Sequence, residues 1–348
     1  MSSLRISPKA FLLLCRITLA AVVLNVVTGA AVRLSDSGLG CPDWPTCSQH
    51  HLTPPLRLHP LIEFGNRMVV GLLVVAAALT VVASFRRQPA RRDLRWLAFG
   101  LVLGILGEAV VGAVVVYSKL NAYVVVCHFL VGMALLATAT VLTLRAGHAA
   151  GRGTPAVSPG VLRATRVLLA ALAAAIVAGA LTTGAGPHAG GKGAKRIPVP
   201  LVDMTRVHAE FVLATVAVLL VVVWMLWRTD APGHVQNASL VLLAVMVAQG
   251  IIGYTQYFTH LPAVLVGIHV FGASMVVATA LWFHHGLSDH LAVDADAEPG
   301  PGRTARLADE MPAMSTATSG AELPVGVATG SEGASTPTSV DVALGEPA

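Results

Sequence analysis

The sequence predicts an all-α membrane protein in which eight transmembrane helices form two pseudosymmetric four-helix bundles. The first observation is composition: 55% of the 348 residues are hydrophobic and 12% are charged, whereas a soluble domain carries about 25% charged residues. The second is a series of long apolar runs, and the third is a repeated pattern of polar residues inside them. The composition excludes a soluble enzyme, a disordered chain and a nucleic-acid-binding protein.

Eight apolar runs are long enough to cross the hydrocarbon core of a bilayer, which requires about 20 residues. The first run is too long for the apolar part of a signal peptide and no small-residue cleavage site follows it, so we expect a helix there too. The runs are continuous rather than alternating, which excludes a transmembrane barrel. They occupy roughly residues 11–32, 61–84, 96–117, 121–144, 162–184, 202–227, 238–258 and 262–285.

The distribution of basic residues predicts the orientation. Twelve Lys and Arg residues lie on the side that holds both termini and seven on the opposite side, and such an excess marks the cytoplasmic side. We therefore expect a multi-pass protein of a bacterial cell membrane with both termini in the cytoplasm. The expected parts are a cytoplasmic N-terminus (1–10), an N-terminal half (11–145), a cytoplasmic linker (146–161), a C-terminal half (162–285) and a disordered cytoplasmic tail (286–348).

The two halves share a spacing of polar residues. In each half a glycine precedes a histidine by 16 residues, and a second polar residue precedes that histidine by 61 or 62. Matching offsets in matching spans indicate a parallel duplication with an axis along the membrane normal. The glycine–histidine pairs are Gly112–His128 and Gly253–His269, and the earlier polar residues are Asn66 and His208.

Asn66, His128, His208 and His269 form one polar layer inside the membrane. They lie about 5–7 residues from the outer ends of their spans, which is a depth of about 8–11 Å. Two histidines on facing helices, His208 and His269, suit axial ligation of a haem iron; hydrogen bonding between helices is the alternative. Zinc would need more ligands, and no cysteine or acidic cluster completes such a site.

The N-terminal half pairs His128 with Asn66, and asparagine is a poor iron ligand. Two interpretations stay open: this half holds a haem by one histidine, or it holds a haem only transiently. The asymmetry indicates that one half keeps a cofactor and the other handles a substrate.

Glu63 is the only acidic residue in the second span and lies one turn before Asn66. A carboxylate in a dry site can take part in proton transfer; the alternative, compatible with it, is an ion pair with Arg67 at i+4. Arg67 is also a candidate to contact the haem propionates. Glu108, in the third span, is a weaker candidate, with a hydrogen bond inside the bundle as its alternative.

The first outer loop contains Cys41 and Cys47, six residues apart across two prolines. On the oxidising side of the membrane these cysteines are expected to form a disulfide, either structural or redox-active.

At these residues the sequence resembles the haem A synthase family, over about residues 11–285. The resemblance rests on seven segments in the family's order: "GAAVRLSDSGLGCPDWPTC", "IEFGNRMVVG", "VVVCHFLVGMALL", "TGAGPHAGG", "RVHAEFVLATV", "QGIIGYTQYF" and "VGIHVFGAS".

The resemblance implies an eight-helix bundle that oxidises the C8 methyl group of haem O to a formyl group, giving haem A for terminal oxidases. It implies a haem b cofactor held by His208 and His269, with His128 as an axial ligand in the substrate site. Glu63 matches the catalytically important glutamate of the family. The family usually has histidine where this chain has Asn66.

The alternative function is a di-haem membrane cytochrome that transfers electrons from quinol, and a secondary transporter is a further competitor. The cytochrome would hold two haems permanently, which the unequal pair of Asn66 and His128 disfavours. As a haem-dependent oxidoreductase, the protein would have haem O, haem A and the lipid bilayer as partners, with haem O synthase and an electron acceptor as further ones.

Overall fold

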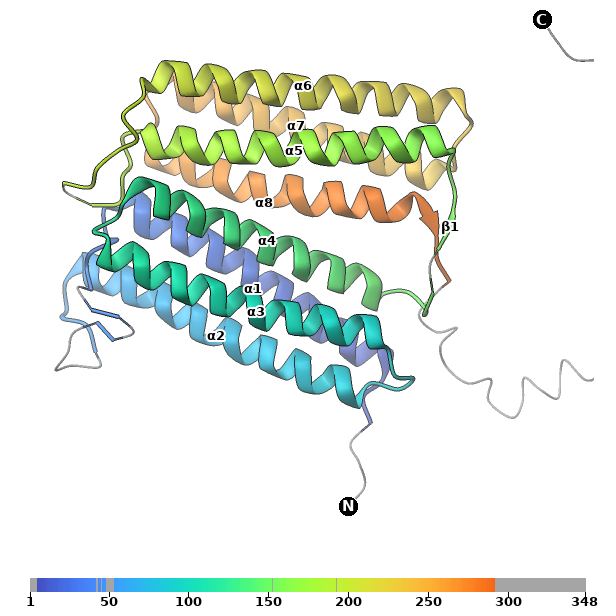
Figure 1. The fold of residues 1–348 in the computed structure, drawn as a ribbon, viewed down its shortest axis with the longest axis horizontal. Helices are drawn as coiled ribbons and strands as arrows, with labels where there is room; N and C mark the ends of the chain where they lie inside the picture. The colour runs from blue at the N-terminus through green and yellow to red at the C-terminus, as the bar shows by residue number, and fades with distance from the viewer. Residues whose placement is uncertain are drawn as a thin grey trace, which may run out of the picture. The chain divides into compact units, whose positions relative to one another are not determined.

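The computed structural model describes residues 5–41, 43–44, 46–47, 53–151, 153–191 and 193–291. Eight long helices account for most of them, and each is long and apolar enough to cross a membrane, which confirms the expected all-α membrane fold. Most extend a few residues beyond the expected ends. They are α1 (Pro8–Leu34), α2 (Leu58–Arg86), α3 (Arg92–Tyr117), α4 (Ala122–Ala146), α5 (Pro159–Ala185), α6 (Leu201–Arg228), α7 (Gly233–Phe258) and α8 (Ala263–Gly286) (Figure 1).

The predicted tail begins at residue 286, and from residue 292 onward it lies outside the described residues. The antiparallel course of the helices gives the bundle two ends. We call the end that carries the loops 35–57, 118–121, 186–200 and 259–262 the long-loop end, and the opposite one the terminal end.

The first helix of each half begins with the same local signal. The Ser7 hydroxyl accepts the amide N–H of Ala10 at 3.2 Å, and the Ser158 hydroxyl accepts that of Val161 at 3.4 Å. In both helices a proline follows the serine at the first helical position. Serine caps an amide that the helix leaves unpaired, and proline has no amide to leave unpaired.

The turns before α4 and α8 have the same backbone conformation. Lys119 and Leu120 have φ values of 53° and 62°, and His260 and Leu261 have 63° and 59°. L-residues other than glycine rarely adopt positive φ. Its occurrence at two consecutive positions in both turns supports the internal repeat.

Helix packing is compatible with a two-fold relation between the halves. Within each half the helices pack in pairs, α1 on α2, α3 on α4, α5 on α6 and α7 on α8 (Figure 1). Between the halves, α4 packs against α5 and α8, and α1 packs against α8. Exchanging α1 with α5 and α4 with α8 converts the α1–α8 contact into the α4–α5 contact and leaves the α4–α8 contact in place.

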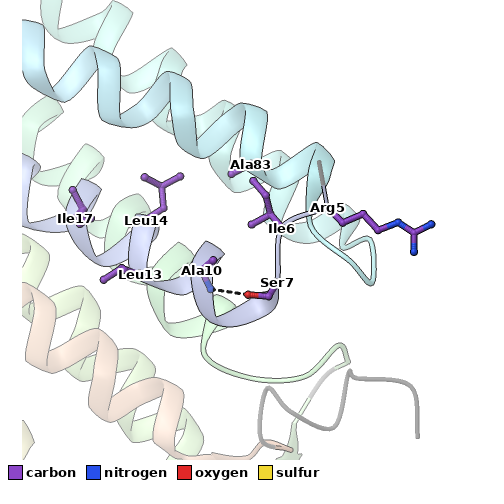
Figure 2. A pocket seen from close by; sticks show the side chains of 8 residues that line it. All are labelled: Arg5, Ile6, Ser7, Ala10, Leu13, Leu14, Ile17 and Ala83. Carbon is purple, nitrogen blue, oxygen red and sulfur yellow. Dashed lines mark hydrogen bonds between the residues drawn. The ribbon is translucent and has the colours of Figure 1, made fainter. Parts of the chain in front are cut away.

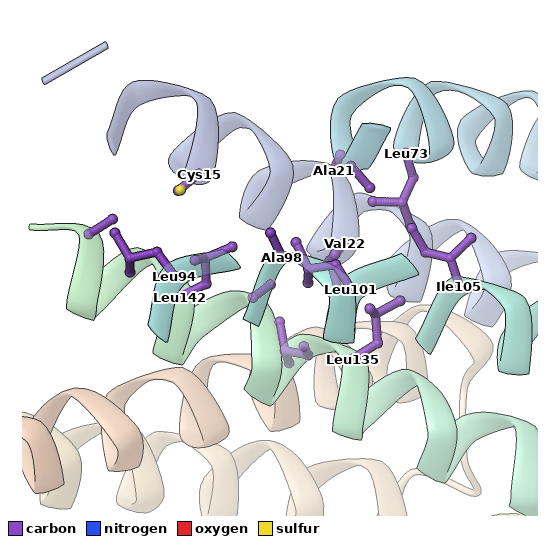
Figure 3. Packing of buried hydrophobic residues seen from close by; sticks show 14 of the residues in the cluster. Cys15, Ala21, Val22, Leu73, Leu94, Ala98, Leu101, Ile105, Leu135 and Leu142 are labelled. Carbon is purple, nitrogen blue, oxygen red and sulfur yellow. The ribbon is translucent and has the colours of Figure 1, made fainter. Parts of the chain in front are cut away.

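Each half has its own apolar core. Leucine, alanine and other apolar side chains from α1 to α4 interlock in the N-terminal half, among them Val22, Leu73, Leu101 and Leu135 (Figure 3). A second cluster joins α5 to α8 and includes Leu168 and Leu219. These cores hold the helices in register and so fix the relative positions of polar residues on neighbouring helices.

At the terminal end, strand β1 (Thr154–Pro155) pairs antiparallel with β2 (Ser288–Asp289). Beside them the rings of His285 and His290 stack with centroids 4.1 Å apart, and the His148 ring lies within 5.0 Å of both.

A pocket also opens at the terminal end, beside the start of α1. Because the polar layer lies toward the long-loop end of the helices, this pocket is separate from the candidate site. It is lined by Arg5, Ile6, Ser7, Ala10, Leu13, Leu14, Ile17 and Ala83 (Figure 2).

Candidate functional site

The four residues of the polar layer lie on the even-numbered helices near the long-loop end. Asn66 is on α2, His128 on α4, His208 on α6 and His269 on α8, each six to eight residues after the first residue of its helix. At about 1.5 Å per residue this places them at a similar depth, about 9–12 Å into the helices.

The structure brings His208 and His269 together. Their ring centroids lie 6.4 Å apart with the ring planes at 84°. A β-carbon on Gly179 would lie 2.9 Å from Cε1 of His208, and one on Gly253 would lie 3.2 Å from Cε1 of His269. A side chain at either position would therefore crowd the ring, more severely at Gly179, so these glycines leave the space that the two rings occupy.

The geometry of this pair fits two axial ligands of one iron. Nδ1 of His208 donates to the Ala175 carbonyl at 3.0 Å, which leaves the Nε2 lone pair of His208 for a metal. An iron midway between the rings would lie about 3.2 Å from each centroid, half of their separation. That distance is close to a metal–imidazole bond of about 2.0 Å plus the radius of the ring.

The pair does not fit a metal bound by protein ligands alone. Within the described part of the chain, no group of three or more His, Cys, Asp or Glu side chains could hold a metal ion. A structural zinc site takes four such ligands, whereas a haem supplies four nitrogens from its own ring and needs only one or two axial ligands from the protein.

In the N-terminal half, His128 lies against the equivalent glycine. A β-carbon on Gly112 would lie 3.4 Å from Cε1 of His128, matching the contact between Gly253 and His269. The His128 side chain is 36% exposed, so protein atoms leave much of the ring accessible to a ligand.

Asn66 contacts α1 through its side-chain amide. The Thr28 hydroxyl lies 2.7 Å from Oδ1 of Asn66, the shortest of the contacts that this hydroxyl makes. A hydroxyl has a single proton to donate, and donation to Asn66 uses one of the two lone pairs of the amide oxygen and anchors the side chain to α1.

Glu63 is buried, and both of its carboxylate oxygens have partners. Oε1 accepts from Nη2 of Arg67 at 2.6 Å, and Oε2 accepts from the backbone amide of Cys41 at 2.8 Å. The ion pair with Arg67, the alternative weighed from the sequence, is therefore present. Glu63 also lies one turn before Asn66 on α2.

Arg67 holds the loop between α1 and α2 against α2. Its Nη1 donates to the carbonyls of Asp43 at 2.8 Å and Thr46 at 2.6 Å. The same loop contains the Cys41–Cys47 disulfide, which confirms the expected pairing. Glu63 and Arg67 thus fasten a cross-linked loop to the long-loop end of the N-terminal half.

A second set of contacts fixes the loop between α5 and α6. Arg33, at the end of α1, donates to the carbonyls of Thr183 at 2.6 Å and His188 at 2.7 Å. Nε2 of His188 donates to the Leu261 carbonyl at 2.8 Å. The loop after α5 is therefore fixed both to the N-terminal half and to the turn before α8.

Comparison with known families decides where the chain belongs. Residues 12–190, more than half of the chain, match the model of the COX15-CtaA family, described as cytochrome oxidase assembly proteins. This chain belongs to the COX15-CtaA family. The matched region includes Glu63, Asn66 and His128 and ends before His208 and His269.

Individual relatives of this COX15-CtaA chain carry the name haem A synthase. The relative from Geobacillus kaustophilus is 33% identical over 145 residues, which are 38% of this chain and 44% of the relative. The relative from Shewanella oneidensis is 32% identical over 150 residues, 38% of this chain and 44% of the relative. These alignments thus span less than half the length of either relative. The relative from Halalkalibacterium halodurans is 28% identical over 274 residues, 74% of this chain and 88% of the relative.

Two features of this COX15-CtaA chain were not predicted from the sequence. Thr28 had no assigned role, although the segment around Gly29, "VVTGAA", resembles "IVAGAL" around Gly179 in the C-terminal half. Aligning the two segments would have given Gly29 the position equivalent to Gly179. Because Gly179 contacts His208, the residue equivalent to Asn66, that alignment would have predicted that Thr28 lies near Asn66. The role of Arg33, which ties the end of α1 to the loop between α5 and α6, depends on contacts between residues more than a hundred positions apart and has no local signal.

Proposed function

We propose that this protein oxidises the C8 methyl group of haem O to a formyl group, producing haem A for terminal oxidases. The observation that carries the proposal is the placement of His208 and His269, whose rings lie 6.4 Å apart in a chain of the COX15-CtaA family. The name of the relatives, haem A synthase, supports the same reaction.

The C-terminal half is proposed to hold haem b. His208 and His269 would be its axial ligands, with Gly179 and Gly253 leaving the space that the two rings occupy. Bound there, haem b would supply one-electron redox chemistry that a carboxylate or amide side chain cannot. The donation from Nδ1 of His208 to Ala175 fixes the tautomer that leaves Nε2 as the ligand atom.

The N-terminal half is proposed to bind haem O through His128. Glu63 is the proposed catalytic residue: its carboxylate would accept a proton released as the methyl group is oxidised, and Arg67 and the Cys41 amide keep it in place. Arg67 is also proposed to contact a propionate.

The orientation of the protein in the membrane and its partners in the cell are also proposed. We propose that the protein spans a bacterial cell membrane with both termini in the cytoplasm, so that the long-loop end faces outward. Residues 11–145 would form the substrate half and residues 162–285 the cofactor half. The reaction also needs an electron acceptor, and haem O synthase is the proposed source of substrate.

An absorption spectrum of the purified protein, combined with chromatography of the extracted haems, tests the function. We expect haem b together with haem O or haem A, and conversion of added haem O into haem A. Two permanently bound, redox-active b-type haems with no conversion of haem O would instead support the di-haem cytochrome. A protein that binds no haem would contradict both functions.

A further inference from the structure

The side-chain amide of Asn66 keeps an unused hydrogen-bond donor. The Thr28 hydroxyl donates to its Oδ1 at 2.7 Å, and among the described residues its amide nitrogen has no hydrogen-bond partner. An amide nitrogen carries hydrogens and has no lone pair available for a metal. In this arrangement Asn66 is a poor iron ligand, but its nitrogen can donate a hydrogen bond.

The equivalent position in the C-terminal half is arranged differently. There His208 donates from Nδ1 to the carbonyl of Ala175 on α5 and keeps Nε2 for a metal. Aligning Gly29 with Gly179 places Asn25 at the position of Ala175 and Thr28 at that of Ala178. Helix α1 thus offers a hydroxyl to its partner on α2, where α5 offers only apolar side chains and a backbone carbonyl.

The space beside Asn66 also differs from that beside His208. A β-carbon on Gly179 would lie 2.9 Å from the His208 ring, whereas a β-carbon on Gly29 would have no neighbouring atom within 4 Å. Asparagine is also shorter than histidine. The surface of Gly29 beside Asn66 is therefore free of the close contact that the His208 ring makes with Gly179.

We propose that His128 is the only protein ligand of the haem in the N-terminal half, and that Asn66, anchored by Thr28, donates a hydrogen bond to a water molecule in the axial position opposite His128. This inference rests on the proposed function, because it requires a haem at that site. It assigns to Asn66 and Thr28 a binding site for a small exogenous ligand. The same site would accept other small ligands of haem iron.

Carbon monoxide is the probe for this site, because it binds ferrous haem only at an open axial position. The full-length protein, loaded with haem O and reduced, is expected to bind carbon monoxide at the haem that depends on His128 and not at the haem held by His208 and His269. The H128A variant identifies the spectral contribution of the first haem. A His128-dependent haem that does not bind carbon monoxide would overturn the inference.

Asn66→His tests the open position directly. No atom would lie within 4 Å of a β-carbon on Gly29, so a histidine at position 66 meets no obstacle there. With a second imidazole as ligand this haem should become low-spin and lose most of its carbon monoxide binding. Unchanged binding of carbon monoxide in a folded N66H protein would contradict the open position.

Asn66→Leu and Thr28→Val test the hydrogen bond without filling the position. Both variants should still bind carbon monoxide, and the C–O stretching frequency should rise because the bound ligand loses its donor. Thr18→Val is the matched control: Thr18 lies on the same helix and bonds to Thr80 on α2 at 2.8 Å, toward the terminal end. T18V should leave the C–O stretching frequency unchanged. If N66L and T28V both leave it unchanged as well, the role of Asn66 as hydrogen-bond donor is refuted.

The outcomes also separate this inference from the proposed function. The protein could convert haem O to haem A while its His128-dependent haem does not bind carbon monoxide. That result would contradict only the inference of an open axial position. If H128A alters none of the bound haem, no haem occupies the N-terminal half, and the proposed substrate site is wrong together with the inference.

Discussion

Nδ1 of His128 on α4 lies 3.3 Å from Oε2 of Glu108 on α3. The corresponding residue in the C-terminal half, Gln249, makes a different contact: its amide donates to the backbone carbonyl of His269 at 2.7 Å and not to the ring. Among the described residues, only the N-terminal half sets a carboxyl group beside its histidine ring. The two groups are within contact distance without a hydrogen bond between them, so a small movement of either side chain would let Glu108 accept from Nδ1 and orient the ring for a ligand at the opposite nitrogen.

Glu108→Gln should weaken the haem site of the N-terminal half. Glutamine replaces the acidic neighbour of the His128 ring by an amide that can donate to it, so the midpoint potential of the His128-dependent haem should shift and its retention should fall by about 10- to 100-fold. Redox titration followed by absorption measures both. Gln249→Leu, in the other half, is the matched control and should leave the potential of the His128-dependent haem unchanged.

Glu63→Gln should separate proton transfer from the anchoring of the loop. Glutamine keeps the size of the side chain and can still accept the Cys41 amide, but it has no carboxylate to take up a proton. Conversion of haem O should fall by at least about 100-fold, the usual scale for a positioned acid–base group, and the haem b spectrum should remain. Near-normal production of haem A together with a lower melting temperature would show that Glu63 serves only as the partner of Arg67.

His208→Ala and His269→Ala should each abolish the low-spin haem b spectrum while the protein remains in the membrane. Each change removes one of two proposed axial ligands, and alanine cannot replace it. Absorption spectra of membranes that contain equal amounts of each variant provide the measurement, with H128A as a control that keeps haem b. A normal haem b spectrum in the double variant would rule out this pair as ligands.

Replacing Cys41 and Cys47 together by serine should lower stability by about 2–3 kcal/mol, because the cross-link restricts the unfolded loop. Thermal unfolding in detergent measures the loss. Mass spectrometry of protein isolated without reductant should find the two cysteines in one cross-linked peptide. Two free thiols under those conditions would contradict the disulfide.

Contacts at the terminal end should weaken as the pH falls. Burial, with the nearby His148 and Arg145, lowers the pKa of His290 below its ordinary value, so the unfolded segment binds a proton more readily than the folded one. The stabilisation is therefore present above the unfolded pKa of about 6.5 and is lost as the pH falls below it. The protection factors of the Ala149 and Ala156 amides, which bond to Leu291 and Leu287, should fall as the pH is lowered from about 7.5 to about 5.5. His290→Asn should remove this fall in protection once the observed rates are corrected for intrinsic exchange at each pH.

The sequence by itself determined the eight helices and the depth of the polar layer. A bilayer imposes a minimum apolar length and requires backbone hydrogen bonds to be made within each helix, and both conditions act on consecutive residues. The ion pair between Glu63 and Arg67 could also be predicted from the sequence, because residues at i and i+4 are neighbours on the surface of any helix. The Cys41–Cys47 disulfide followed from a spacing of six residues.

Only the tertiary structure decided which side chains meet across helices. The contact of Thr28 with Asn66 joins residues 38 apart, and that of Arg33 with the His188 carbonyl joins residues 155 apart. Whether such residues touch depends on the rotation of each helix about its axis and on its register with its neighbour. Those quantities are set by the packing of whole helix faces, including glycines such as Gly179 that let a ring approach, and no local pattern specifies them.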